Sequence, residues 1–268
     1  MDFESDVIIT IGTRVTIDNE SVKKYIDRAL LGDKIEFIYM HPIDDISLQN
    51  KYTQYIKYEA GSEEGVFALL ASFLIDHSTP EYKKYINDLD IGYLSGETSV
   101  GEEEFEQLVE TLEDKKNITF VIGEDIYEHE SKKNIINFIR LIDMYTDIHV
   151  VLLGATSKID LAKNIHLTDV SPIHTYNGTV IYTISVDGAT QEDNLLKGSA
   201  SFATAAKIQD GDTIDIKYES QTERRKFVID PSIRGTIALY PMSDGKHDNK
   251  IETGYRFKRV QIQKVNLK

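Results

Sequence analysis

The sequence predicts an α/β fold: a doubly wound, mainly parallel sheet followed by a mostly β, barrel-like domain. Two observations carry this prediction. Up to about residue 155, short apolar runs alternate with segments of helical periodicity, as in repeated strand–helix–strand units. Beyond about residue 164, the segments become short, rich in β-branched residues and separated by Asp-Gly turns. We therefore expect a Rossmann-like domain at 1–165 and a β-barrel domain at 166–268.

The first strand is predicted at 6–12, a nearly continuous apolar run that ends at glycine. Parallel strands covered on both faces have this composition. A helix follows at 20–31, where apolar residues recur at helical spacing. Further strands are predicted at 34–40 and 54–58.

The next predicted helix, at 61–76, has Glu63 and Glu64 in its first turn, where the helix dipole favours acidic side chains. The remaining elements of this half are helices at 80–88, 101–114 and 131–145 and strands at 117–123 and 148–154. Right-handed crossovers between such units give a parallel sheet with helices on both faces.

In the second half, Asp-Gly dipeptides predict tight reversals, because they adopt positive φ at little cost. They occur at 186–188, 209–212 and 244–245, and Arg234-Gly235 is a similar signal. The predicted elements are strands at 213–218, 226–229 and 235–240 and a short helix at 202–207.

Composition excludes several kinds of chemistry. The 268 residues include no cysteine, which rules out thiolate-held iron–sulfur clusters, cysteine–zinc sites and thiol nucleophiles. The formal net charge of −15 makes nucleic acid an unfavourable partner. Two basic stretches, at 224–226 and in the tail from Arg256 to Lys268, are interpreted as solvated strand edges.

No apolar run approaches the roughly 20 residues that span a bilayer. The first residues are acidic and lack the basic and apolar regions of a secretion signal. We therefore expect a cytoplasmic protein without direct membrane insertion.

Sequence motifs nominate no catalytic residue and no metal site. Phosphate-binding loops, H-E-x-x-H and G-x-S-x-G are all absent. His129 stands among Glu124, Asp125, Glu128 and Glu130, but acids are also expected at a helix start, and that interpretation is preferred to a hard-metal cluster.

Ligands of doubly wound sheets bind beyond the carboxyl ends of the strands. By this rule the crevice candidates are Gly12, Thr13 and Arg14 after the first strand, His41 after the second, and Gly61 before the long helix. A plain strand-to-helix turn explains the same residues.

Two stretches resemble the molybdopterin oxidoreductases. The first comprises Ile11-Gly12-Thr13-Arg14, Tyr39-Met40-His41-Pro42, the segment 56–65 that opens a helix, and Phe120 to Asp125 followed by the strand 150–153. The second runs from Ala205 through Gln209-Asp210-Gly211-Asp212 to Ile214 and resumes at Val228 and Ile233 to Ile237. It is similar to the C-terminal dinucleotide-binding module of these enzymes, which implies a double-psi β-barrel.

Within this superfamily the chain most resembles the C-terminal part of the molybdopterin-oxidoreductase-like component of bacterial NADH:quinone oxidoreductase, or complex I. The resemblance implies a structural role in the peripheral electron-input arm, with no redox centre and no cofactor in this chain. It also implies partners, namely other subunits or the N-terminal cluster-binding domains of a respiratory complex, at the inner membrane's periphery. Because the cysteine-rich segments of the family are absent, the resemblance implies either an excised fragment or a truncated paralogue.

Two alternatives stay open. The chain could be a small-molecule or nucleotide-binding protein that uses the crevice of Gly12, Thr13, Arg14, His41 and Gly61. It could also be a subunit of another molybdenum or tungsten oxidoreductase whose partner supplies the metal ligand. The structural role makes one further prediction: apolar surface should be exposed where the missing domains would cover it.

Overall fold

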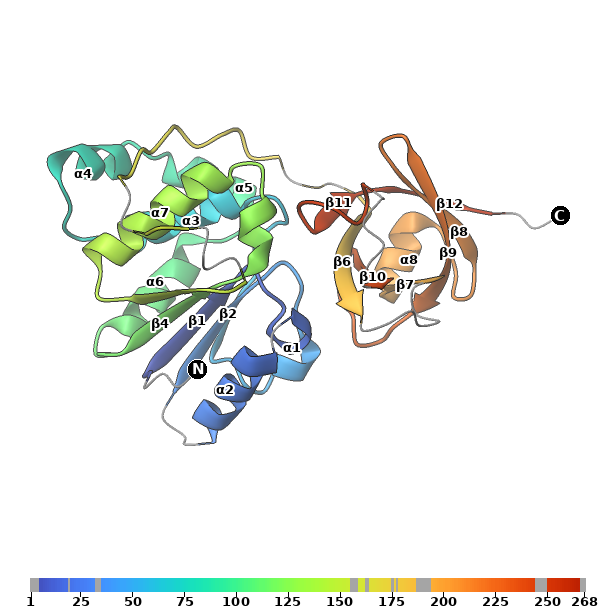
Figure 1. The fold of residues 1–268 in the computed structure, drawn as a ribbon, viewed down its shortest axis with the longest axis horizontal. Coiled ribbons are helices and arrows are strands. Elements are labelled where there is room, and N and C mark those ends of the chain that lie inside the picture. The colour runs from blue at the N-terminus through green and yellow to red at the C-terminus, as the bar shows by residue number, and fades with distance from the viewer. Residues whose placement is uncertain are drawn as a thin grey trace. The chain divides into compact units, whose positions relative to one another are not determined.

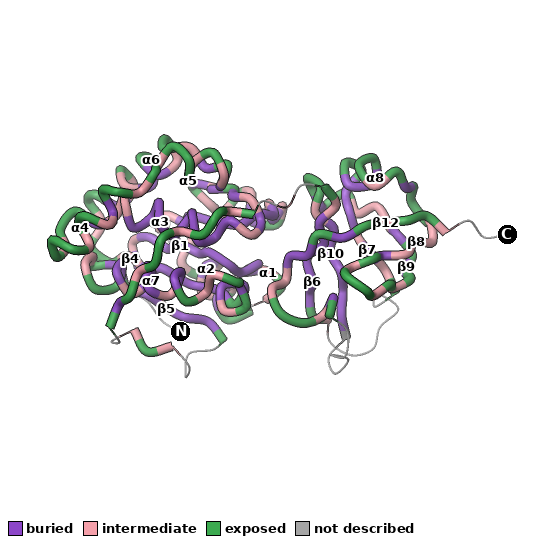
Figure 2. Tube along the Cα trace, turned by 90° about the horizontal axis from the view of Figure 1, so that it is seen from above, coloured by how far each residue is buried: buried purple, intermediate pink, exposed green. Residues whose placement is uncertain are grey.

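The computed structural model describes residues 5–18, 20–31, 35–154, 159–161, 164–174, 176, 178–186, 194–243 and 250–265. The chain divides into two compact units (Figure 1). The first unit comprises Met1–Pro42 and Ser47–Thr175, and the second comprises Ile43–Ile46 and Tyr176–Lys268. Each has its own sheet and its own apolar core, and the strands of the first unit are largely buried (Figure 2).

The first unit contains a five-stranded sheet with the order β3-β2-β1-β4-β5. All neighbouring strands are parallel. The strands are β1 (Val7–Ile11), β2 (Glu36–Met40), β3 (Gln54–Ile56), β4 (Ile118–Ile122) and β5 (His149–Leu152). The chain runs outward from β1 to β3 and then returns to the other side of β1 as β4, so the predicted doubly wound topology is confirmed.

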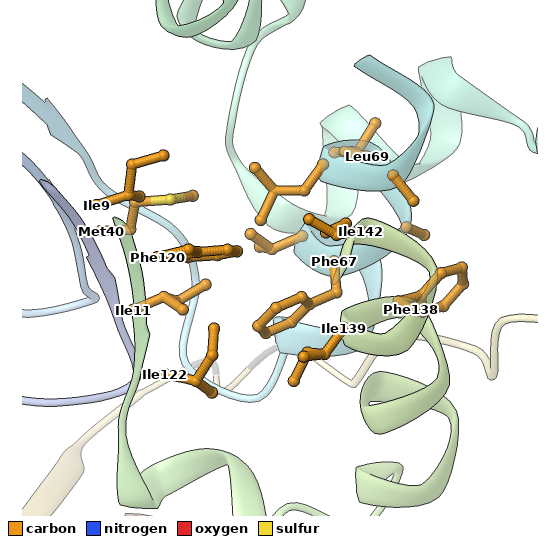
Figure 3. Packing of buried hydrophobic residues seen from close by; sticks show 14 of the residues in the cluster. Ile9, Ile11, Met40, Phe67, Leu69, Phe120, Ile122, Phe138, Ile139 and Ile142 are labelled. Carbon is orange, nitrogen blue, oxygen red and sulfur yellow. The ribbon is translucent and has the colours of Figure 1, made fainter. Parts of the chain in front are cut away.

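Helices cover both faces of this sheet. Alternate residues of each strand point to opposite faces, and the strands carry apolar residues on both, so each face packs against helices. Ile8 belongs to one core with Val22 and Ile26 of α2 (Glu20–Leu30). Ile9 and Ile11 belong to the larger core, which contains α3 (Glu63–Leu74), α6 (Glu102–Leu112) and α7 (Lys132–Tyr145). Figure 3 shows strand residues such as Met40 and Phe120 facing Phe67 and Ile142 of the helices.

Three further helices complete the unit, namely α1 (Val15–Asp18), α4 (Pro80–Asn87) and α5 (Ile91–Thr98). Short 3-10 turns lie at Ile46–Leu48 and Glu124–Glu128. The sequence pattern does not predict α5, because Gly92 and Gly96 weaken its helical signal. Asp90 nevertheless caps this helix by accepting a 3.0 Å hydrogen bond from the Tyr93 amide, and Leu94 packs into the core.

An extended segment at 164–174 crosses the helices of the first unit. Asn134 of α7 donates to the Thr168 carbonyl at 3.0 Å and accepts from the Thr168 amide at 3.0 Å. The Tyr82 hydroxyl donates to the Ile165 carbonyl at 3.2 Å. The first unit consequently extends to Thr175, ten residues beyond the boundary expected at 165.

The second unit is a curled seven-stranded mixed sheet with the order β11-β6-β10-β7-β9-β8-β12. Its strands are β6 (Val180–Val186), β7 (Leu195–Gly198), β8 (Thr213–Tyr218), β9 (Gln221–Ile229), β10 (Ile237–Ser243), β11 (Phe257–Arg259) and β12 (Gln261–Lys264). The parallel pairs β6–β10 and β7–β9 are joined by an antiparallel contact between β10 and β7. Such interleaved parallel pairs agree with the expected double-psi-like barrel.

The sheet curls because the chain passes from one of its edges to the other over a single residue. β11 pairs with β6, β12 pairs with β8, and only Val260 separates β11 from β12. The Val260 amide donates to the Thr179 carbonyl at 3.0 Å, and the Thr179 hydroxyl donates to the Val260 carbonyl at 2.6 Å. The helix α8 (Ala200–Ala206) contributes its buried residue Phe202 to the core of the barrel, together with Leu196 and Phe227.

Two of the four predicted turns lie among the described residues. Gly211 and Gly235 have φ of +83° and +81°, as the tight turns at 209–212 and 234–235 require. The residues of the expected turns at 187–188 and 244–245 lie outside the described residues.

One prediction about charge is wrong. The pattern favours a solvated strand edge at 224–226, but Arg225 is buried. Its guanidinium carbon lies 3.4 Å from the ring centroid of Tyr240. The guanidinium donates hydrogen bonds to the Glu223 carboxylate at 2.8 Å and to the Pro241 carbonyl at 2.6 Å. A fully partnered arginine can be buried, which its neighbours in sequence do not indicate. Lys258 of the basic tail is buried as well and donates to the Thr253 carbonyl at 2.7 Å.

Among the described residues, no helix combines the length and the apolar character that crossing a membrane requires.

Candidate functional site

The candidate site lies where the strand order of the first unit reverses. The chain leaves β1 toward β2 on one side, and β4 occupies the other side. The connections after β1 and β4 run to helices on opposite faces of the sheet, and in open parallel sheets ligands bind at this position. Gly12 and Thr13 follow β1, His41 follows β2, and Gly123 and Asp125 follow β4.

The loops after β1 and β4 are in direct contact. Gly123 donates its amide to the Ile11 carbonyl at 2.7 Å, and Asp125 donates to the Gly12 carbonyl at 3.1 Å. A Cβ added to Gly123 would lie 2.1 Å from the Gly12 carbonyl oxygen. A Cβ added to Gly12, which has φ of +68°, would lie 2.8 Å from Ile126. The space between the two loops is therefore filled by the chain itself, and even a methyl group does not fit.

Thr13 and Arg14 participate in the turn that starts α1. Asp18 accepts a 2.7 Å hydrogen bond from the Arg14 amide and a 3.3 Å hydrogen bond from the Thr13 hydroxyl. Both Thr13 and Arg14 are buried. This arrangement matches the plain strand-to-helix turn that the sequence also allows. In it, Asp18 binds the Thr13 hydroxyl and the Arg14 amide, the polar groups that follow Gly12.

His41 is held from several sides. Its Nε2 lies 3.6 Å from Oδ2 of Asp125, with the two side chains 0% and 1% exposed. Its ring stacks on Tyr39 with a centroid distance of 5.8 Å, and its carbonyl accepts a 2.9 Å hydrogen bond from the Tyr55 hydroxyl. The ends of β2 and β4 are thus connected through a buried polar pair across β1.

Gly61, the fifth predicted residue, belongs to a second buried pair. The Nε2 of His129 lies 3.1 Å from the Gly61 carbonyl oxygen and 3.3 Å from Oε2 of Glu63. The Ser131 amide donates to Nδ1 of His129 at 3.0 Å. The neutral ring therefore carries its proton on Nε2, which points it toward Gly61 and Glu63.

The electrostatics of His129 combine opposing effects. Burial alone would lower its pKa, because it disfavours the charged ring. The hydrogen bond and charge of Glu63, assisted by the Gly61 carbonyl and Glu130, outweigh burial and raise the pKa of His129 above its ordinary 6.5. The Ser131 amide acts in the opposite direction, since a doubly protonated ring would have to give up that hydrogen bond.

Tyr58 lies between the two pairs. Its side chain is buried, and burial, reinforced by the charges of Glu63 and Asp125, raises the pKa of Tyr58 well above its ordinary 10.0. The phenol therefore keeps its proton at all physiological pH values.

Glu64 extends the polar cluster to the segment at 164–174. Its Oε1 accepts from the Asn134 side-chain amide at 2.7 Å, and its Oε2 accepts from the Ser171 backbone amide at 3.2 Å. The sequence pattern favours Glu63 and Glu64 as acids at a helix start, and both are in fact buried. They connect α3 to α7 and to the loop that carries His129.

The structure gathers Gly12, Thr13, Arg14 and His41 at one edge of the sheet and places Gly61 beside His129. It adds Tyr58, Glu63, Asp125 and His129, which sequence reasoning does not select for a site. The signal available for Glu63 and Glu64 is their position directly before the apolar run 66–71 of α3. Within the described part of the chain, no group of three or more His, Asp or Glu side chains could hold a metal ion.

Chemically, the cluster contains acids and bases that face one another in buried pairs. Its paired groups connect four loops and two helices at the edge of the sheet where an enzyme would place its ligand. No protein-family model matches the sequence, and no curated protein matches it. The case for any function therefore depends on these residues and their geometry.

Proposed function

We propose that this chain is a non-catalytic structural portion of the peripheral electron-input arm of NADH:quinone oxidoreductase. In this proposal it is equivalent to the C-terminal part of the component of that arm that has the molybdopterin-oxidoreductase fold. It contributes shape and contacts to the arm and carries no redox centre. In the cell it lies in the cytoplasm, at the periphery of the inner membrane, as part of that complex.

The observation that carries the proposal is the closed position where the sheet's strand order reverses. The backbone of Gly123 touches that of Gly12, and Ile126 fills the space beside Gly12. The ionisable groups around it, His41 with Asp125 and His129 with Glu63, are buried in pairs. A fold kept without its ligand chemistry is expected to fill its crevice in this way, because unpaired buried charges are costly.

Two further features support the structural role. The sequence has no cysteine, so the chain cannot supply thiolate ligands to an iron–sulfur cluster. The order of a doubly wound sheet and a curled barrel also agrees with the resemblance to the rear part of molybdopterin oxidoreductases.

The expected apolar patch is not present among the described residues. Their exposed large apolar side chains are Ile17, Leu31, Tyr93 and Met144, which lie in α1, after α2, in α5 and in α7. This scatter counts against the structural role, which requires apolar surface where the missing domains would pack. Under the proposal, the chain has to meet its neighbours through mainly polar surface, whereas permanent interfaces are usually more apolar.

The rival interpretation, a small-molecule or nucleotide site at the same edge, would require the Gly12–Gly123 contact and the His41–Asp125 pair to open. Nucleotides should then raise the melting temperature of the chain. Under the structural proposal, they leave the melting temperature unchanged.

Native gel electrophoresis of a gently solubilised membrane extract tests the association. The proposal predicts that an antibody against this chain marks the same band as NADH-oxidising activity. Migration of the chain as a free species of its own mass would contradict the proposal.

A further inference from the structure

The second unit contains a cavity of about 710 Å³ that the proposed function does not use. It opens beside the barrel, between the end of α8, strand β8 and the β11–β12 turn, and all its lining residues belong to this unit. The volume falls within the range of roughly 300–1,000 Å³ that is typical of small-molecule sites.

The cavity is lined by three cationic side chains, Lys207, Lys217 and Arg259, and by one acid, Glu219. Glu219 is already matched, because its Oε2 lies 2.5 Å from Nζ of Lys250. The lining therefore has an excess of positive charge in a chain whose formal net charge is −15. Such a local reversal attracts anions that the rest of the surface repels.

The three cations of the cavity are exposed and have few partners within the described part of the chain. Among the described residues, the side chains of Lys207 and Arg259 have no hydrogen-bond or ion-pair partner. Lys217 donates to Oε1 of Gln263, a neutral acceptor, at 2.8 Å, and it also interacts with the charge of Asp215, which Arg224 binds directly. Elsewhere in the barrel, cations such as Lys264 do pair with acids, in that case Asp212 at 2.7 Å.

The backbones that carry these cations are fixed before any ligand binds. Lys207 ends α8 with φ of +57°, and its amide donates to the carbonyls of α8. Lys217 is paired with Gln261, and Arg259 with Val180, in the barrel's antiparallel ladders. Because the backbone is already ordered, binding costs less conformational entropy, although the side chains still lose rotamer freedom when a ligand binds.

The remaining lining defines the class of ligand. Ala206 and Ile262 offer apolar contact to a short carbon frame. The carbonyl end of α8 disfavours negative charge, so an anion has to be bound by the side chains rather than by the helix. An arginine fork with two lysine ammonium groups suits carboxylate or phosphate oxygens, and three cations call for more than one negative charge.

We propose that this cavity binds a small multivalent anion, either a polyphosphate or a polycarboxylate, through Lys207, Lys217 and Arg259. The site is independent of the closed sheet edge in the first unit. Its failure would leave the structural role of the chain untouched, and failure of that role would leave this site untouched.

Isothermal titration of the full chain with pyrophosphate and with citrate, at a fixed ionic strength near 0.15 M, tests the site. We expect binding of at least one of them with a Kd below about 1 mM. Pyrophosphate binding without citrate binding would identify phosphate as the preferred chemistry, and the reverse would identify carboxylate. Either result supports the site.

A double variant, Lys207→Gln with Arg259→Gln, should weaken this binding at least about tenfold, since two charge-assisted contacts are lost. The matched control is Lys83→Gln with Lys84→Gln, which removes the same charge from exposed positions on α4 in the first unit. We expect the control to change Kd less than about threefold. Amide spectra of both variants verify that the barrel is folded, and if Arg259→Gln unfolds it, Lys217→Gln with Lys207→Gln replaces it.

Three outcomes overturn the proposal. Neither anion binds below about 1 mM. The control variant loses as much affinity as the cavity variant, which would indicate general charge attraction. A hexaglutamate peptide binds at the cavity while both small anions fail, which would make this surface a docking site for an acidic chain segment.

Discussion

Oε2 of Glu63 lies 3.3 Å from Nε2 of His129, and the two residues come from the start of α3 and from the loop before α7. Both side chains are buried, so neither can exchange its partner for water. The pair therefore fixes the entry to the main core helix against the loop after β4.

Replacement of His129 by alanine should destabilise the first unit by about 3–5 kcal/mol, because it leaves the buried Glu63 carboxylate without its partner. Urea unfolding followed by far-ultraviolet circular dichroism measures this loss. Glu128→Ala is the matched control, since Glu128 is 59% exposed and lies 3.8 Å from Lys132. We expect the control to change stability by less than about 1 kcal/mol. Equal losses in the two variants would contradict the structural importance of the buried pair.

The His129 pair should also make stability depend on pH. The folded-state pKa of His129 is raised above 6.5, so the pair's contribution is fully present below about pH 6.5 and is lost as pH rises through the folded pKa. Imidazole proton resonances should report that raised pKa directly, and Glu63→Gln should lower it and remove this part of the pH dependence. A pKa below 6.5 in the unmodified chain would mean that the Ser131 hydrogen bond and burial prevail.

Gly123→Ala should test the closed sheet edge, because its Cβ would lie 2.1 Å from the Gly12 carbonyl oxygen. Backbone must shift to admit it, and we expect a loss of about 2 kcal/mol or more, as for overpacked cores. Gly96→Ala in α5 is the control, since its Cβ meets nothing within 4 Å. There we expect a gain of about 0.5–1 kcal/mol from helix propensity. If Gly123→Ala were neutral in the same unfolding assay, the edge would be open rather than filled.

In the barrel, Arg225→Ala should cost about 3–5 kcal/mol, because it leaves Glu223 without its buried cation and exposes the face of Tyr240. Arg225→Lys should recover only part of this loss, since lysine lacks the planar fork. Arg224→Ala is the control, because that neighbouring arginine is 60% exposed in its pair with Asp215. A loss below about 1 kcal/mol is expected for it, measured by thermal unfolding of the second unit. Similar losses of stability for Arg225→Ala and Arg224→Ala would show that the burial of Arg225 does not contribute to the stability of the barrel.

The sheet of the first unit can be predicted from its sequence because its strands are short, apolar and bounded by glycine or proline. Gly12 and His41 are placed correctly at strand ends for the same reason. The helix α5 is not predicted because Gly92 and Gly96 mask its periodicity. Its cap, Asp90, and its buried residues, Leu94 and Thr98, stabilise it. Local pattern thus predicts those elements whose own composition carries the signal.

The polar cluster cannot be predicted in the same way, because its pairs join residues far apart in the sequence. Glu63 meets His129, and Glu64 meets Asn134 and Ser171. The apolar run 66–71 that follows the two glutamates hints at their burial, but it does not indicate their partners, and acids at a helix start are usually solvated. The same holds for Arg225, whose partners Glu223, Pro241 and Tyr240 come together only when the barrel forms.

Native mass spectrometry of the chain, purified from its source without a tag, tests the central claim most directly. The structural proposal predicts that it appears in an assembly with cysteine-bearing, iron–sulfur subunits of an NADH-oxidising complex, either as part of a longer polypeptide or as a separate chain. The mass bound by this chain itself should include no pterin or nucleotide. Recovery of the chain alone, or with such a small ligand in place, would contradict the proposal and favour the rival binding function.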